Sequence, residues 1–92
     1  MRAREKIGNT PDPAVIALMA LGWVLQDERR AQRLLDLTGL SPEMLRERAD
    51  DPVILAAILS FLESHEPDLV ACADSLGLAP EMIVNAHREL HS

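Results

Sequence analysis

The feature that most constrains the fold of this chain is an internal repeat. Residues 39–44 (GLSPEM) return as residues 77–82 (GLAPEM), 38 positions later. The same ungapped offset gives ten identities between residues 15 and 45, and it places the only tryptophan, Trp23, opposite the only phenylalanine, Phe61. A repeat of this length is one supersecondary unit that buries its apolar face against a neighbour. The sequence therefore predicts two tandem units, at about residues 13–50 and 51–90.

Each unit has the pattern of three helices. Helix starts are marked by prolines that follow capping residues, with Thr10 or Asp12 as the first cap. Gly39 and Gly77 mark the ends of the second and fifth helices. The expected helices cover about residues 13–26, 27–38, 42–49, 53–63, 64–76 and 80–90, and no segment alternates with period two. The predicted fold class is all-α: a compact bundle of about six short helices with a pseudo-twofold axis.

Two of the expected helices are almost wholly apolar. Residues 15–25 and 53–62 carry no charged side chain. Such a pattern indicates helices that are buried on most sides. We expect the two to pack together at the centre, with Trp23 and Phe61 in related core positions. Cys72 shares the apolar side of its helix with Leu69 and Leu76, so we expect it to be a small buried hydrophobe.

Composition excludes several kinds of chemistry. The chain has 92 residues and a net charge of −6, which argues against general attraction to nucleic acid or anionic lipid. A single cysteine excludes an internal disulfide framework and a four-thiolate zinc site. Two aromatic rings are too few to stack single-stranded nucleic acid.

The chain is expected to be one domain with a short tail. Residues 1–10 include Arg2, Arg4 and Lys6 and are predicted to be a flexible basic N-terminal tail, followed by a single all-α domain over residues 11–92. The apolar run of residues 15–25 is too short to span a bilayer and is not followed by a signal-cleavage pattern. We therefore expect a cytoplasmic protein without a membrane segment.

Several motifs resemble a bacterial family of short, all-helical proteins of about 90 residues, a domain of unknown function. They are the segments ALGW (residues 20–23), LLDLTGLSP (residues 34–42), LRERADDP (residues 45–52) and FLE (residues 61–63). The resemblance covers about residues 14–90. It implies a compact helical fold and an intracellular bacterial setting. It transfers no catalytic or binding role, because no activity of the family is known.

Both units contain the corner of a helix-turn-helix motif. Its apolar, glycine and apolar positions are filled by Leu35, Gly39 and Leu45 in the first unit and by Ala73, Gly77 and Ile83 in the second. The same residues would form any tight helix–glycine–helix corner. Arg46 and Arg48 are the candidate base-reading side chains of the first unit, but acidic residues flank them.

The charges divide unevenly between the two units. Residues 13–50 hold five basic and six acidic groups, whereas residues 51–90 hold one basic and seven acidic groups. The candidate interaction surface consists of the arginines of the first unit: Arg29, Arg30, Arg33, Arg46 and Arg48. A solvated surface would explain them, as would complementarity to a protein partner or head-to-tail pairing of copies. Salt would weaken such pairing.

The sequence has no combination of residues that indicates a catalytic or cofactor-binding site. His87 and His91 have the spacing of two zinc ligands on a helix, but no further ligand supports them. His65 is expected to be a surface or capping residue, and Cys72 has no histidine near it in sequence. We therefore expect a non-enzymatic interaction or adaptor module without metal or cofactor, which binds an unidentified protein or itself. The alternative is a DNA-associated helix-turn-helix module that uses the arginines of residues 29–48.

Overall fold

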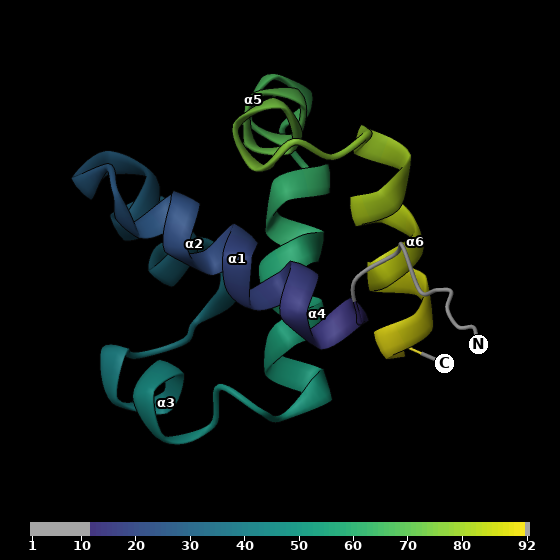
Figure 1. The fold of residues 1–92 in the computed structure, drawn as a ribbon. Coiled ribbons are helices and arrows are strands. Elements are labelled where there is room, and N and C mark those ends of the chain that lie inside the picture. The colour runs from purple at the N-terminus through teal and green to yellow at the C-terminus, as the bar shows by residue number, and fades with distance from the viewer. Residues whose placement is uncertain (1–11, 92) are drawn as a thin grey trace.

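Short capping sequences set the helix boundaries in the computed structural model, which describes residues 12–91. These residues form six helices and no strand, as the all-α prediction requires (Figure 1). The helices are α1 (Pro13–Leu25), α2 (Glu28–Thr38), α3 (Pro42–Glu47), α4 (Pro52–Glu63), α5 (Glu66–Leu76) and α6 (Pro80–His91). The predicted tail at residues 1–10, with Thr10, lies outside the described residues.

The caps follow the local sequence closely. Asp12 accepts a hydrogen bond from the backbone N–H of Ala14 at 2.8 Å, so it is the cap of α1. Asp27, Ser41 and Asp51 cap α2, α3 and α4 in the same way. His65 occupies the capping position of α5, but its side chain makes no capping bond. Gly39 and Gly77 end α2 and α5 at φ angles of 76° and 71°, in the left-handed region that favours glycine.

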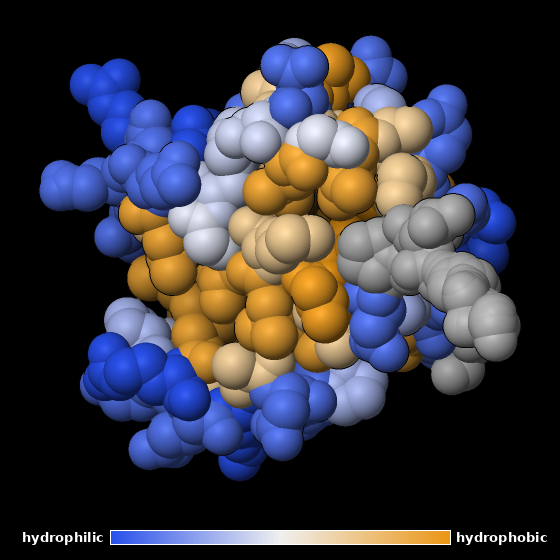
Figure 2. All heavy atoms as spheres, viewed as in Figure 1, coloured by the Kyte–Doolittle hydropathy of each residue, from blue (hydrophilic) through white to orange (hydrophobic). Residues whose placement is uncertain are grey.

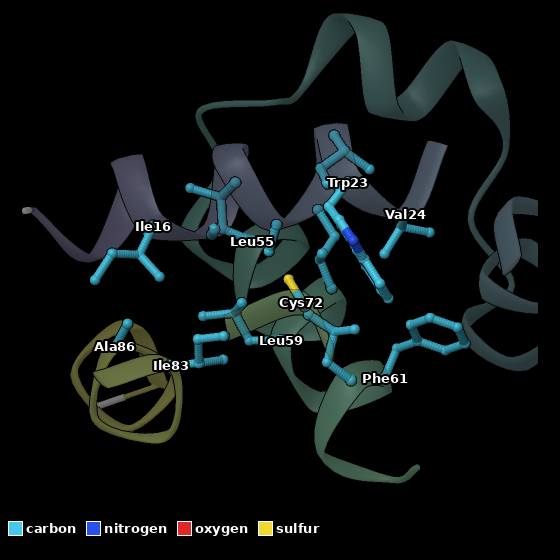
Figure 3. Close-up of a cluster of buried hydrophobic side chains, with 14 of the residues drawn as sticks. Ile16, Trp23, Val24, Leu55, Leu59, Phe61, Cys72, Ile83 and Ala86 are labelled. Atoms are coloured by element: carbon cyan, nitrogen blue, oxygen red, sulfur yellow. The ribbon is translucent and has the colours of Figure 1, made fainter. Parts of the chain in front are cut away.

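The core forms where α1, α4 and α6 pack against one another, with α2 and α5 covering further sides of α1 and α4 (Figure 1). Most of its side chains come from α1, α4, α5 and α6, and Trp23, Phe61 and Cys72 lie among them (Figure 3); Leu34 of α2 and Leu45 of α3 also belong to the core. The expected central packing of the two apolar helices and the burial of Cys72 are therefore confirmed.

The two predicted units do not have equivalent surroundings. The third helix of the first unit, α3, has 6 residues and lies at the edge of the bundle, whereas α6 has 12 residues and packs on α1 and α4 (Figure 1). Trp23 and Phe61 are both buried, but arginines of the same helix, α2, cover both rings. The structure does not show a twofold relation between the units, so duplication stays a prediction from the sequence.

The structure buries α1 on most sides, as expected, but one narrow strip of its outer face is exposed. Its neighbours α2, α4, α5 and α6 bury most of the helix surface, including Ile16 and Val24. Val15, Leu18 and Leu25 face outward and are 46%, 43% and 51% exposed. No helix within residues 12–91 fully covers these three side chains. Uniform apolarity could not reveal which side of the helix would remain in contact with water.

Candidate functional site

The structure divides the five arginines of the predicted interaction surface into two groups. Arg30 belongs to the group that stabilises the protein itself. Its guanidinium lies 3.7 Å from the centroid of the Trp23 ring, and its Nη2 donates a hydrogen bond to the Trp23 carbonyl oxygen at 2.8 Å. The carbonyl is among the last of α1, where a cation also interacts favourably with the helix dipole. Arg30 therefore ties the start of α2 to the end of α1.

Arg33 joins α2 to two other helices. Its Nη2 forms an ion pair with Asp68 of α5, and its guanidinium lies 5.7 Å from the centroid of the Phe61 ring in α4. The Asp68 side chain is 17% exposed and that of Arg33 is 42% exposed, so the pair is partly shielded from solvent. Sequence reasoning missed both roles, because a long side chain can cover apolar surface while its charged end reaches a partner.

The other three arginines are available to a partner. Arg29 at the start of α2, Arg46 in α3 and Arg48 just after α3 are exposed, and they make no ion pair or hydrogen bond through their side chains within residues 12–91. The structure therefore does not bring all five arginines into one free cluster. It leaves a smaller set that we call the exposed arginines: Arg29, Arg46 and Arg48.

An apolar surface that sequence reasoning missed lies along α1. Val15, Leu18, Gly22 and Leu25 are exposed, and we call them the α1 stripe. Their 3-4-3 spacing places them along one side of the helix. Figure 2 shows apolar side chains across the face formed by α1, with hydrophilic side chains over the start of α2 and over α3 at its border. Because the inner side of α1 is equally apolar, no signal in the sequence distinguishes this stripe from the buried side.

A pocket of about 520 Å³ that several polar side chains line lies between α4 and α6. His87 Nδ1 is 2.5 Å from Glu63 Oε2, and Ser60 and His91 line the same pocket. The contact with Glu63 leaves the other ring nitrogen of His87 as the one free for a ligand. The rings of His87 and His91 are 6.1 Å apart, but no group of three potential metal ligands occurs within residues 12–91.

Cys72 lies in the core, where burial disfavours the reactive form of its thiol. The side chain is buried among the core residues, and burial raises the pKa of its thiol to about 11. At neutral pH the thiol is protonated, and the thiolate is the reactive form.

Among residues 12–91, no single helix is long and apolar enough to cross a membrane. Only α5 and α6 taken together, across a bend of 103°, reach that length and composition.

A match to one family model shows which family the chain belongs to. The model of a family described as a protein of unknown function, DUF3572, matches residues 10–92. The chain belongs to the DUF3572 family. The resemblance seen in the sequence, to a helical domain of unknown function, is thereby confirmed. No curated protein and no solved structure matches the chain.

The functional surface of this DUF3572 chain must therefore be argued from its own residues. Two exposed features of the described chain bring several residues together: the α1 stripe and the exposed arginines, whereas the exposed Leu37, Val53 and Val70 lie one each on α2, α4 and α5. The pocket between α4 and α6 has polar groups, but its histidine and carboxylate already pair with each other. The two features that α1, α2 and α3 present are thus the stronger basis for a function.

Proposed function

We propose that the chain is a non-enzymatic helical module that binds another protein chain through the α1 stripe, with the exposed arginines at its border. The observation that carries the proposal is the composition of α1. None of its thirteen residues has a charged or amide side chain, yet its outer face meets solvent. A helix that is apolar on all sides is normally covered on all sides.

The arrangement around the stripe fits a protein interface. Such interfaces have an apolar centre and a polar rim, and arginine is enriched in them relative to the rest of the surface. Here the centre is the α1 stripe, and Arg29, Arg46 and Arg48 belong to the elements that border it in Figure 2. Acidic residues alternate with these arginines in α2 and α3, so the rim has mixed charge and fits a protein better than a polyanion.

The adaptor role is also supported by the state of the reactive groups. Cys72 is buried with a raised pKa, and Glu63 occupies one nitrogen of His87. Ser60 lines the same pocket but makes no hydrogen bond to His87. A nucleophile activated by a base would need such a bond, at about 2.6–3.2 Å. We place the module in the cytoplasm, where its one cysteine would remain reduced.

Site-specific photo-cross-linking in living cells tests this proposal. A photoreactive amino acid at position 18 in the α1 stripe should give a discrete adduct with a protein chain. The matched control is position 70 on α5, because Val70 is 49% exposed and Leu18 is 43% exposed. An adduct that forms at position 18 and not at position 70 supports the proposal. Equal labelling at both positions, or none at position 18, contradicts it.

A DNA-associated role is the second candidate, and it is supported by the left-handed glycines at both corners and by the angle between α5 and α6. Gly39 and Gly77 are left-handed, and α5 and α6 meet at 103°, within the range of about 90–120° for such motifs. Since α6 packs on α1 and α4, the helix free to enter a groove is α3, with Arg46 and Arg48 exposed. A salt-dependent gel shift that Arg46→Glu with Arg48→Glu abolishes would favour this role; no shift at low salt would remove it.

A further inference from the structure

The α1 stripe has the spacing of a coiled-coil seam. Val15 and Gly22 occupy positions equivalent to a, and Leu18 and Leu25 occupy positions equivalent to d, of two successive heptads. In a surface helix without a partner, these positions would carry polar side chains. Their apolar character and exposure indicate that a second helix lies along α1 in the assembled protein.

The stripe is complementary to itself when two copies run antiparallel. In antiparallel pairs, an a position of one helix lies opposite a d position of the other. Centred on residue 20, this register places Val15 opposite Leu25 and Leu18 opposite Gly22 of the partner copy. Gly22 has open space above it, since an added Cβ would meet no atom within 4 Å. The large Leu18 side chain thus faces the one position on the stripe that has room for it.

Charge favours this face over the other surfaces for self-association. The stripe lies in residues 13–50, which hold five basic and six acidic groups and are nearly neutral. Residues 51–90, which form α4, α5 and α6, hold one basic and seven acidic groups. Two copies that met through their acidic halves would repel each other, whereas α1 has no charge to repel its counterpart.

We infer that the occupant of the α1 stripe is a second copy of this chain, which packs α1 against α1 in an antiparallel, twofold-symmetric dimer. This inference rests on the proposed docking role of the stripe. Thirteen residues give a contact about 20 Å long and about 10 Å wide. That area is small beside the roughly 800 Å² per partner of a standard interface, so the dimer should dissociate in the micromolar range.

Sedimentation of the purified full chain over a range of micromolar concentrations measures this association. We expect a reversible monomer–dimer equilibrium whose dissociation constant rises about tenfold or more in Leu18→Glu. Val70→Glu is the control, because it adds the same charge at an exposed apolar site on α5. Raising the salt from about 50 to about 500 mM should leave the dimer intact, whereas it would weaken head-to-tail pairing of arginines with acidic residues.

Disulfide trapping tests the antiparallel register. Chains with Leu18→Cys, mixed with chains with Gly22→Cys, should form mainly the mixed 18–22 disulfide, and the native thiol of Cys72 is buried and does not compete. Dominant 18–18 and 22–22 disulfides would overturn the register. A wild-type chain that remains monomeric at several hundred micromolar would overturn self-association. If position 18 still cross-linked to a different protein in cells, the proposed docking role would stand while this inference failed.

Discussion

Arg29, Arg30 and Arg33 lie within one and a half turns of α2, yet they differ at the scale of single residues. Arg29 is exposed, Arg30 covers the Trp23 ring, and Arg33 pairs with Asp68 beside Phe61. The sequence predicts that these three arginines lie on one helix, but it does not predict which of them contact the aromatic rings of the core. That choice depends on where α1 and α4 place their rings, which is a tertiary property. The number of charged residues on a helix therefore does not show how many of them are available to bind a partner.

The role of Arg30 leads to a stability prediction. Arg30→Lys keeps the charge but cannot both stack on Trp23 and donate to its carbonyl oxygen, so the free energy of unfolding should fall by about 1–2 kcal/mol. Urea unfolding followed by circular dichroism measures the change. Arg29→Lys is the matched control on the same helix, and its effect should remain within about 0.5 kcal/mol. Equal effects of the two substitutions would show that the contact of Arg30 with Trp23 contributes nothing.

The buried thiol of Cys72 predicts a pH dependence. Its pKa is about 11 in the folded protein and near 9.0 for an unperturbed cysteine. The unfolded chain therefore loses this proton first, and stability falls as the pH rises from about 9 to about 11. Below pH 9 the contribution of the thiol is fully present. Urea midpoints should fall more steeply over this interval in the wild type than in Cys72→Ala, and parallel curves would contradict the buried, protonated thiol.

At the scale of elements, local signals predict the helix boundaries well. Five of the helices have a proline at or near their start, and two end at a left-handed glycine. These residues act within one turn, so the neighbouring sequence is enough to predict the helix boundaries. The exposed side of α1 is different, because the helix has no polar residue to mark it. Local sequence also does not predict the different roles of α3 and α6. The two helices begin with nearly identical residues, but α3 has 6 residues and α6 has 12.

The glycines provide a test of this view of the elements. Gly22 lies inside α1 with open space above it, so Gly22→Ala should raise the free energy of unfolding of the monomer by about 0.5–1 kcal/mol. Gly39 has a φ of 76°, so Gly39→Ala should lower that free energy by about 1–2 kcal/mol. Thermal unfolding at low concentration compares the two variants. Changes of the same sign in the unfolding temperatures of the two variants would contradict this view of the two glycines.

At the scale of the whole molecule, burial and charge are distributed in a way that leaves one face for association. The core draws mainly on α1, α4, α5 and α6, and residues 51–90 have one basic group against seven acidic groups, so they hold most of the net negative charge. Among residues 12–91 the core leaves six large apolar side chains exposed, and three of them lie in the stripe on α1; the others, Leu37, Val53 and Val70, lie one each on α2, α4 and α5. A chain of this length buries only about two-thirds of its surface when it folds alone, so a partner on α1 would add directly to a modest core.

Gly22→Leu separates folding from association more directly than any other change. Leucine is a better helix former than glycine and meets no atom of its own chain within 4 Å at its Cβ, so the urea midpoint of the monomer should rise. The same side chain would collide with Leu18 of the partner copy, so sedimentation should show monomer at concentrations where the wild type is dimeric. A variant that unfolds later and no longer dimerises agrees with the account. A variant that dimerises as tightly as the wild type contradicts it.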